Sequence, residues 1–409
     1  MTNAPPLEGL RVLDLSWVMV GPVSGRYLAD LGADVVKIES ARRIDPLRTL
    51  GPFKDGRVGR ERSVSYHNLN AGKRSLAINI RNPRGREIIL KLAEWADVVL
   101  ESFTPGVLDD MGLAYADISK RNQRVIMVST SILGQTGPHA VGASGVGTMG
   151  AAMSGATFQL GWPDRPPIGP WGPWTDAVAP RFIVASILAA LHRRKRTGEG
   201  CYIDVAQAEA GIQFMMPAFY EYAANGVVPQ RRGADIAPTR VPSGVYRCAG
   251  DDKWIAIDAS DAKRFEALRN TIGGDTRDRT FDTLIGRIRA RARLDNAIAH
   301  WTRTRNADEV ERQLQQAGVA SHLVSRAGDL ARDAHVLAAK HLRRINDPVI
   351  GEADIEGPRF ALDRTPHAEI RRGPRIGEHN HEILRELCGM SEGEIALLAD
   401  SGVLETNTG

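Results

Sequence analysis

The sequence predicts an α/β protein whose larger part is a doubly wound, Rossmann-like domain around a parallel sheet. Short apolar runs alternate with stretches of helical periodicity through the first half of the chain, which is the pattern of β-α-β units. The opening unit has a buried strand at 10–15, a helix at 24–31 after the breaking pair Gly21-Pro22, and a second strand at 35–39. Two strands joined in this way are parallel, with a right-handed crossover.

The next elements continue the alternation. A helix begins at Asn82, a capping residue, and Pro83 follows where its missing N–H has no partner to lose. Ligands of such sheets bind beyond the C-terminal ends of the strands. Further strands are predicted at 75–80, 97–101, 125–129 and 201–205, and further helices at 82–94 and 206–225. The strand ends expected to meet a ligand are 16–20, 40–43, 81, 102–103 and 130–131.

The length of 409 residues favours more than one domain. We predict a large domain over 1–225, a small α/β domain over 232–330 and a segment at 331–409 that returns to the large domain. Between 227 and 241 the composition shifts to Pro, Gln and Arg with few apolar residues, which indicates a boundary. The small domain is predicted from a hairpin within 243–257 and helical stretches around 262–272, 279–304 and 307–317.

Composition narrows the classes of function. Apolar residues make up 43% and charged residues 25%, as in ordinary globular proteins, and the formal charge of +4 is spread along the chain. Nucleic acid is therefore not an expected partner, whereas a small polyanionic ligand is compatible. Cys201, Cys248 and Cys388 fit no metal motif and no disulfide framework. The start of the chain lacks a secretory pattern, and no apolar run reaches about 18–20 residues, so we expect a cytoplasmic protein that does not bind membranes.

Several catalytic motifs are missing. Gly21 and Gly25 do not have the G-x-G-x-x-G spacing, which argues against a bound dinucleotide. Gly145, Gly147 and Gly150 do have it, but no strand precedes them, so helix packing is at least as good an explanation. The sequence has no H-E-x-x-H, C-x-x-C, P-loop or G-x-S-x-G motif. We expect no metal ligands.

The stretch 171–180 contains the strongest candidate for chemistry. It reads Trp-Gly-Pro-Trp-Thr-Asp-Ala-Val-Ala-Pro and leads into an apolar helical pattern at 181–195, with Pro180 expected in the first turn. Asp176 would then lie at a helix start, where unpaired N–H groups and the helix dipole keep a carboxylate ionised and able to act as a nucleophile. The alternative is that Asp176 is simply the N-cap, although Thr175 would cap equally well.

A set of short motifs resembles the class III CoA-transferase family, the carnitine and formyl-CoA transferase type. Each motif is weak alone, but their order and spacing cover most of residues 7–215, with fainter matches near the C-terminus. The motifs are Leu-Glu-Gly-Leu-Arg-Val-Leu-Asp-Leu at 7–15, Leu-Ala-Asp-Leu-Gly-Ala-Asp-Val-Val-Lys-Ile-Glu at 28–39, 73–80, Ala-Asp-Val-Val-Leu-Glu-Ser-Phe at 96–103, 111–113, Gly-Gln-Thr-Gly-Pro at 134–138, 153–155 and Arg-Thr-Gly-Glu-Gly at 196–200.

The resemblance implies roles for individual residues. Asp176 matches the nucleophilic aspartate, which precedes the helix ending in the Arg-Thr-Gly turn, and acyl-CoA is a substrate with no permanently bound cofactor. Phosphate contacts are expected of Arg42, Arg43 or Arg81 among the basic side chains, with Arg48 also available. The positions that match CoA contacts are Val18, Met19, Val20, Ile78, Arg81, Ser102 and Phe103. Departures from the family are Ser102 in place of Asn, Asp110 in place of Arg and the pair Gly147-Thr148, and a missing glycine-rich loop makes formyl an unexpected acyl group.

The implied reaction moves CoA from a donor, with succinyl-CoA favoured, to a small carboxylic acid through an aspartyl anhydride and an aspartyl-CoA thioester. The sequence around Asp176 is similar to that of the family branch that acts on substituted succinates such as benzylsuccinate. The resemblance also implies an interlocked, ring-like dimer, either a homodimer or a heteromer with a related subunit. Two alternatives remain, an α-methylacyl-CoA racemase and a non-catalytic subunit of a heteromer. The racemase reading is weakened because residues 140–155 contain no His.

Overall fold

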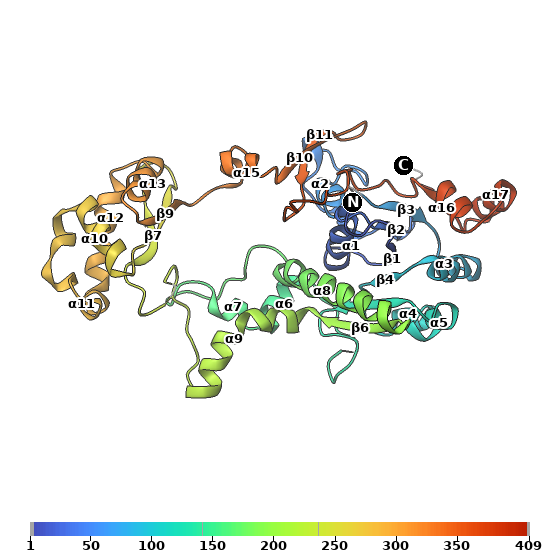
Figure 1. The fold of residues 1–409 in the computed structure, drawn as a ribbon, viewed down its shortest axis with the longest axis horizontal. Coiled ribbons are helices and arrows are strands. Elements are labelled where there is room, and N and C mark those ends of the chain that lie inside the picture. Colours follow the sequence, from blue (N-terminus) through green and yellow to red (C-terminus); the bar gives the residue numbers. More distant parts are fainter. Residues whose placement is uncertain (1–3, 141, 236, 407–409) are drawn as a thin grey trace. The chain divides into compact units, whose positions relative to one another are not determined.

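The computed structural model describes residues 4–140, 142–235 and 237–406, and the chain divides into two compact units. The first unit comprises the chain up to Thr157, Gly169–Val228 and the chain from Leu337 onward, and the second comprises Phe158–Ile168 and Pro229–Val336 (Figure 1). The sequence predicts that residues 158–168 belong to the large domain. They join the second unit because hydrogen bonds tie them to it, among them one from Gly233 N–H to the carbonyl of Gly161 at 2.9 Å.

A six-stranded sheet forms the centre of the first unit, in the order β3-β2-β1-β4-β5-β6 with every neighbouring pair parallel. This strand order reverses direction between β1 and β4, which is the place where doubly wound folds bind their ligands. The strands are β1 (Arg11–Asp14), β2 (Asp34–Glu39), β3 (Arg74–Ala77), β4 (Val98–Glu101), β5 (Ile126–Ser131) and β6 (Cys201–Ala206).

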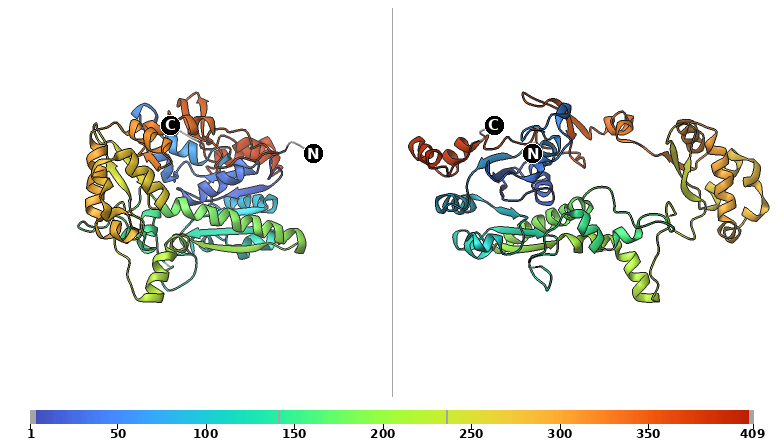
Figure 2. Two further views of the ribbon diagram at one scale, coloured as in Figure 1. Left: turned by 60° about the vertical axis from the view of Figure 1, so that its left-hand side comes forward. Right: turned by 180° about the vertical axis from the view of Figure 1, so that it is seen from behind.

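Helices pack on both faces of this sheet, so the doubly wound α/β prediction is confirmed (Figure 2). One apolar core lies between the sheet and α3, α5, α16 and α17, and the other lies between the sheet and α1 and α8. The helices are α1 (Val20–Asp30), α2 (Val64–Leu69), α3 (Pro83–Trp95), α4 (Val107–Asp110), α5 (Tyr115–Arg121), α6 (Gly147–Met153), α7 (Ala156–Gln159), α8 (Trp174–Thr197), α9 (Gln207–Asn225), α16 (Asn380–Glu386) and α17 (Glu392–Asp400).

Two helices begin earlier than the sequence predicts. α1 begins at Val20, so Gly21-Pro22 lies in its first turn rather than in a break before it; proline is tolerated there because N–H groups of the first turn have no helical partner. α8 begins at Trp174, so Pro180 lies inside the helix. A proline at this position cannot donate to the carbonyl four residues earlier, which belongs to Asp176. Asp176 is thus in the first turn of α8.

The second unit contains a three-stranded antiparallel sheet in the order β7-β8-β9, covered by helices over one apolar core. The predicted hairpin is present as β7 and β8, whereas β9 was not foreseen from the sequence. Its elements are β7 (Ser243–Arg247), β8 (Trp254–Asp258), α10 (Ala262–Ile272), α11 (Leu284–Arg289), α12 (Arg291–Arg303), α13 (Ala307–Gln316), β9 (Ala320–Leu323) and α14 (Ala327–Leu330).

The remaining elements lie within one unit or the other, except α15, which spans the boundary between Val336 and Leu337. The antiparallel pair β10 and β11 packs against Ala71 of the first unit. Their bounds, with those of α15 and the short 3-10 helices, are β10 (Leu342–Asp347), β11 (Gly351–Glu356), α15 (Ala334–Ala338), η1 (Pro46–Thr49), η2 (Lys54–Gly56), η3 (Gly274–Arg277) and η4 (Arg279–Phe281).

α8 corrects one expectation from the sequence. With 24 residues it is long and apolar enough to cross a membrane by length and composition, although no apolar run of that kind was identified in the sequence. A single helix that meets this criterion is weak evidence, since core helices meet it too. In this chain α8 packs on the sheet through buried residues that include Val178, Ile183 and Ile187.

Candidate active site

A cavity of about 240 Å³ opens at the carboxyl ends of β1 to β4 in the first unit. This is the place where the topology of a doubly wound sheet predicts a ligand. Each strand contributes to the wall through the residues at its end or just after it. The lining residues are Leu15, Trp17, Ile38, Glu39, Ser40, Arg43, Ile78, Asn79, Ile80, Arg81, Phe103, Thr104, Val107 and Met111.

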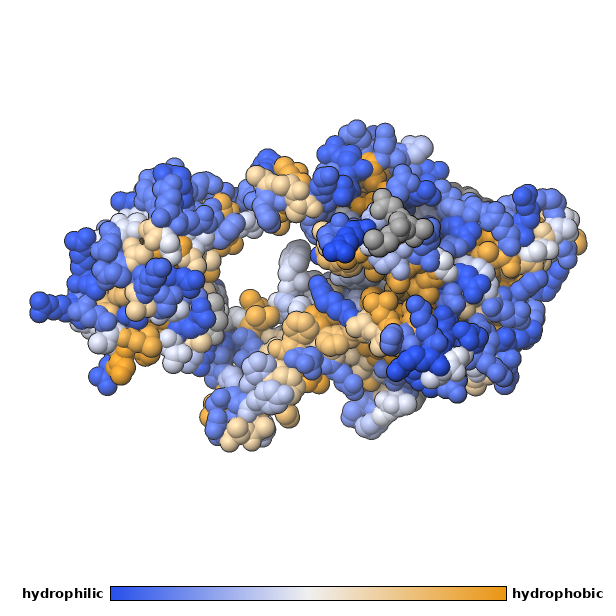
Figure 3. Space-filling model, in the orientation of Figure 1, coloured by the Kyte–Doolittle hydropathy of each residue, from blue (hydrophilic) through white to orange (hydrophobic). Residues whose placement is uncertain are grey.

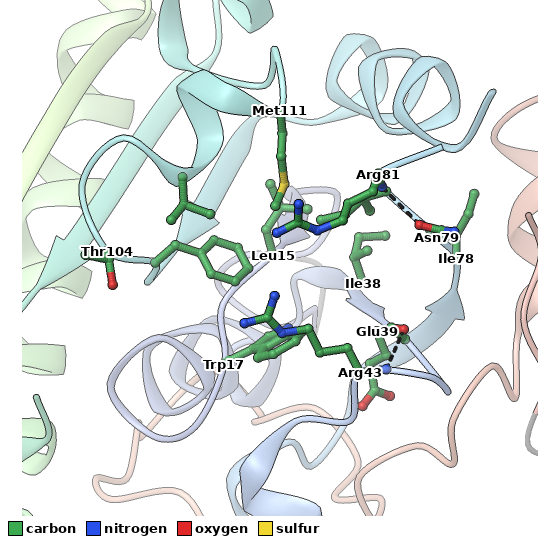
Figure 4. Close-up of a pocket in the computed structure, with 14 residues that line it drawn as sticks. Leu15, Trp17, Ile38, Glu39, Arg43, Ile78, Asn79, Arg81, Thr104 and Met111 are labelled. Carbon is green, nitrogen blue, oxygen red and sulfur yellow. Dashed lines mark hydrogen bonds between the residues drawn. The ribbon is translucent and has the colours of Figure 1, made fainter. Parts of the chain in front are cut away.

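The wall combines aromatic rings with cationic side chains. The rings of Trp17 and Phe103 meet edge to face, with their centroids 5.6 Å apart, and the guanidinium of Arg43 lies 5.8 Å from the Trp17 ring. Figure 4 shows the side chains of Arg43 and Arg81 reaching over this cavity. Flat apolar surfaces suit a nucleotide base, and guanidinium groups suit phosphates. The cavity thus has the chemistry that a nucleotide-bearing acyl-CoA requires.

The predicted contact residues divide into two groups. Ile78, Arg81 and Phe103 line the cavity. Ser102 does not, because its hydroxyl is engaged with the backbone of Trp17, accepting from the N–H at 2.9 Å and donating to the carbonyl at 3.2 Å. Val18 and Met19 lie between β1 and α1, and Val20 is the first residue of α1; none of the three is part of the cavity wall.

Two arginines are placed differently from the sequence prediction. Arg42 does not line the cavity; its guanidinium extends toward Glu405, with Nε 3.7 Å from Oε1. Its neighbour Arg43, the other candidate, lines it instead. Arg48 is unavailable for phosphate because it is fully buried and pairs with Glu39 and Glu61 at 2.9 Å and 2.6 Å. Burial among carboxylates therefore gives Arg48 a structural position that local sequence does not reveal.

Asp176 lies where the N-termini of three helices converge. It occupies the first turn of α8, and its Oδ2 accepts a hydrogen bond of 2.6 Å from the backbone N–H of Gly147, the first residue of α6. The backbone amide of Val20, the first residue of α1, lies close enough to this carboxylate to favour its charged form. The N-cap position belongs to Pro173. Asp176 is thus not the cap of its own helix, and its side chain meets amides of two other helices.

The electrostatic environment of Asp176 has two opposing parts. The side chain is only 3% exposed, and this burial raises the pKa of its carboxyl to about 6, while the amides of Gly147 and Val20 act in the lowering direction. Desolvation disfavours the charged form, whereas hydrogen bonds to the carboxylate favour it. The carboxylate is therefore ionised at neutral pH but far less solvated than an ordinary surface aspartate, which increases its nucleophilicity.

Gly147 was not identified from the sequence as part of the site. A Cβ at this position would lie 2.5 Å from Oδ2 of Asp176 and 2.6 Å from the carbonyl carbon of Pro173. At Gly150 a Cβ would lie 2.2 Å from Oγ1 of Thr175. The small-residue segment therefore lets α6 approach the start of α8 closely. The sequence signal for this close approach was the density of glycines after residue 142. That density was compatible with helix packing and with ligand contact.

The segment after β1 connects the cavity to Asp176. Trp17 forms part of the cavity wall, and three residues later the amide of Val20 favours the charged form of the Asp176 carboxylate. Trp17 was not singled out from the sequence, although it lies within the predicted strand end 16–20.

Glu101, at the end of β4, is a second buried carboxylate. It is 3% exposed and accepts a 2.7 Å hydrogen bond from the N–H of Phe103, which fixes the start of the loop that carries this ring. Burial raises the pKa of Glu101 to about 7, against the lowering effect of Ser129 and the Phe103 amide. Within the described residues no group of three or more His, Cys, Asp or Glu side chains is arranged to hold a metal ion.

Comparison with known proteins agrees with this geometry. The family model described as CoA-transferase family III matches residues 7–380. The chain is 33% identical over 401 residues to succinyl-CoA–D-citramalate CoA-transferase of Chloroflexus aurantiacus, covering 98% of each chain. It is 30% identical to the alpha subunit of succinyl-CoA–L-malate CoA-transferase of the same species, over 98% of this chain and 92% of the relative.

A solved structure is similar throughout. The crystal structure of a CAIB/BAIF family protein from Brucella suis superposes with a TM-score of 0.85 at 29% identity, covering 94% of this chain and all of that one. A family model over nearly the whole length, full-length relatives and a shared fold point the same way. This chain belongs to CoA-transferase family III and is a CoA-transferase.

Proposed function

We propose that this enzyme transfers CoA from succinyl-CoA to a substituted succinate, with Asp176 as the nucleophile. The observation that carries the proposal is the buried Asp176 carboxylate, held by the amides of Gly147 and Val20 at the end of a segment that begins in the cavity wall. The nucleotide part of CoA would occupy the cavity beside Trp17 and Arg43. Its thioester would then lie against Asp176.

The reaction can be written with every bond balanced. A carboxylate oxygen of Asp176 attacks the thioester carbonyl; the C–S bond breaks, leaving a mixed anhydride and CoA thiolate. The thiolate attacks the aspartyl carbonyl, forming aspartyl-CoA thioester and releasing succinate. The acceptor carboxylate then attacks this thioester, and the thiolate that leaves attacks the acceptor carbonyl of the new anhydride, which regenerates Asp176. Covalent catalysis divides one difficult exchange into easier steps.

Backbone amides around Asp176 support the charged intermediates. Negative charge develops on a carbonyl oxygen at each attack, and preorganised N–H donors lower the barrier, with single donors contributing about 3–4 kcal/mol in known cases. The amides of Gly147 and Val20 are already aimed at the aspartyl group. Because a thioester is exchanged for a thioester, no other source of energy is needed.

The names of two relatives support the acceptor class of this proposal. Malate and citramalate are both succinates that carry substituents on the carbon chain, and the relatives described above act on them. Benzylsuccinate is a third substituted succinate, and Trp171, whose side chain is completely exposed, and Trp174 lie just before Asp176. We therefore propose a substituted succinate as the acceptor, with benzylsuccinate as its aromatic candidate.

A second chain is part of the proposal. The exposed side of α9 carries Phe214, Phe219, Tyr220 and Tyr222, each between 54% and 60% exposed, and Figure 3 shows hydrophobic residues gathered where α8 and α9 lie. Such a surface is typical of a protein interface. One relative is an alpha subunit, so the second chain is either another copy or a related subunit. Light scattering on the purified chain, alone and after co-expression with neighbouring reading frames, would distinguish these states.

The test of the activity uses the purified chain with succinyl-CoA and separate acids, namely malate, citramalate, glutarate and benzylsuccinate, followed by mass spectrometry of the CoA thioesters. We expect Asp176→Asn to abolish transfer while CoA still binds, and a CoA adduct to appear on Asp176 in the native enzyme. Asp400→Asn, at an exposed position of α17, is the matched control. Retained turnover in Asp176→Asn would refute the proposal, and exchange of an α-proton with deuterium without an acceptor acid would indicate a racemase.

A further inference from the structure

The segment between β1 and α1 has an unusual backbone conformation. Val18 has φ of 65°, in the left-handed region, where a β-branched side chain is a genuine outlier and only glycine is at ease. Such conformations persist only where the surrounding structure enforces them, and they are concentrated at functional sites. The question is therefore which groups hold Val18 in place.

Four side chains bind the backbone here. Asp14, at the end of β1, accepts from the N–H of Ser16 at 2.9 Å, and the other three come from more distant parts of the chain. Asp45 Oδ1 accepts from the N–H of Val18 at 3.1 Å. Lys37 Nζ donates to the carbonyl of Ser16 at 2.7 Å, and Ser102 Oγ accepts from the N–H of Trp17. Only the bond from Asp45 reaches the left-handed residue itself.

Burial and several polar contacts fix the position of the Asp45 side chain. It is 2% exposed; Oδ1 also accepts from the N–H of Leu47 at 3.0 Å, and Oδ2 lies 3.2 Å from Nζ of Lys37. Lys37 is itself fully buried. Asp45 therefore links Val18, the start of the 3-10 helix η1 and the buried lysine through one carboxylate, and its geometry is set from three sides.

The consequence for Asp176 lies two residues further along the chain. Val20 begins α1, and it belongs to the same buried apolar cluster as Val178 and Ala179 of α8, two and three residues after Asp176. The Val20 amide favours the charged form of the Asp176 carboxylate. Relaxation of Val18 to a negative φ would redirect the backbone before Val20 and turn this amide away. We propose that Asp45 is a positioning residue for CoA transfer, because it holds Val18 in the left-handed conformation that aims the Val20 amide at Asp176. This inference rests on the proposed role of Asp176.

The competing explanation is purely structural. Asp45 is also the N-cap of η1, and loss of a cap lowers stability without affecting one chosen amide. The two explanations differ in their response to Val18→Gly. Glycine adopts a positive φ without strain, so it reduces the need for Asp45 in the positioning role. It does nothing for a missing cap on η1.

The test measures exchange of labelled succinate into succinyl-CoA, which needs Asp176 but no acceptor acid, in the full-length enzyme. Asp45→Ala should lower the maximal exchange rate about 10- to 100-fold, since displacement of about 1 Å at a reacting group has effects of this size, with a smaller change in KM. The apparent pKa of the pH–rate profile should rise as the Val20 amide is lost. In the Val18→Gly background, Asp45→Ala should change the rate less than about threefold relative to Val18→Gly alone.

A loss of exchange that is equally large in both backgrounds, or normal exchange in folded Asp45→Ala, overturns the proposal. Asp45→Asn covers the case in which Asp45→Ala fails to fold, because its amide oxygen can still accept from Val18 N–H. We expect Asp45→Asn to retain most of the exchange activity. A tenfold loss of exchange in Asp45→Asn that persists in the Val18→Gly background also overturns the proposal. Failure of the proposed function itself would be recognised separately, by exchange that survives Asp176→Asn.

Discussion

The backbone N–H of Gly147 lies 2.6 Å from Oδ2 of Asp176, so the first amide of α6 is aimed at the first turn of α8. This contact brings together two segments that are well separated along the chain, and it makes Asp176 part of a helix junction. The positive ends of the helix dipoles are directed toward the carboxylate. The ionisation of Asp176, the stability of the fold and the effects of substitutions at the junction and in the cavity should all reflect this arrangement.

The rate of CoA transfer should depend on the ionisation of Asp176. Burial raises the pKa of this carboxyl to about 6, and only the carboxylate attacks a thioester. Activity should therefore be low near pH 5, reach half its plateau near pH 6 and level off above pH 7. A pH–rate profile of kcat/KM for succinyl-CoA measures this pKa, and a profile still at its plateau at pH 4.5 would contradict the assignment.

The same burial predicts that the nucleophile lowers the stability of the fold. A rise from 3.8 to about 6 means that the folded state binds the proton more tightly than the unfolded state, which costs at most about 3 kcal/mol once both states are ionised. The free energy of unfolding should thus decline as pH increases from about 4 to about 6. Asp176→Asn removes this dependence.

The measurement is the thermal unfolding midpoint of the native chain and Asp176→Asn at pH 4, 6 and 8. The variant should have the higher midpoint at pH 8, and the difference should shrink toward pH 4, where Asp176 is protonated in the folded state and partly protonated in the unfolded state. An Asp176→Asn variant that is less stable than the native chain at pH 8 would show that the amides of Gly147 and Val20 outweigh burial.

Gly147→Ala should impair transfer although it adds a single methyl group. The new Cβ would lie 2.5 Å from Oδ2 of Asp176 and 2.6 Å from the carbonyl carbon of Pro173, so α6 or the start of α8 must move. We expect kcat to fall at least about tenfold. Gly393→Ala is the matched control, because a methyl group on Gly393, in α17, would meet no atom beyond its own stretch of helix within 4 Å. Equal activity in the two variants would show that the junction around Asp176 tolerates the extra atom.

Arg43 and Arg42 should differ as partners of CoA. Arg43 lines the cavity beside Trp17, whereas the Arg42 side chain is 69% exposed and lies near Glu405. Arg43→Ala should raise the KM for succinyl-CoA about tenfold, equivalent to about 1.4 kcal/mol, and Arg42→Ala should raise it less. Steady-state kinetics at low and moderate ionic strength tests the order, and a larger effect of Arg42→Ala would place the phosphates outside this cavity.

Much of the fold was accessible from local patterns. The strands and the Asn82–Pro83 helix start were predicted because alternating apolar runs and capping residues act over a few positions. The starts of α1 and α8 were placed too late, since Gly21-Pro22 and Pro180 suggest breaks that burial against the sheet overrides. β9 was missed because it pairs with β8, which lies about 60 residues earlier in the chain.

The residues of the candidate site were likewise predicted only in part from the sequence. Ile78, Arg81 and Phe103 were found because strand ends are visible in a sequence and the resemblance pointed to them. Arg42 and Arg43 were both candidates, because neighbouring residues in a loop cannot be distinguished before the loop is folded, and Arg43 is the one that lines the cavity. Burial of Arg48 against Glu39 and Glu61 is likewise a property of packing.

The order of residues was sufficient to establish the alternation of strands and helices, the family and the identity of the acidic residue at the start of α8. How that residue is surrounded became known from the folded chain alone. Asp176, Gly147 and Val20 come from three separate helices, and the left-handed Val18 is held by an aspartate 27 positions away. Desolvation and amide orientation depend on distances through space, and no local pattern of residues encodes them.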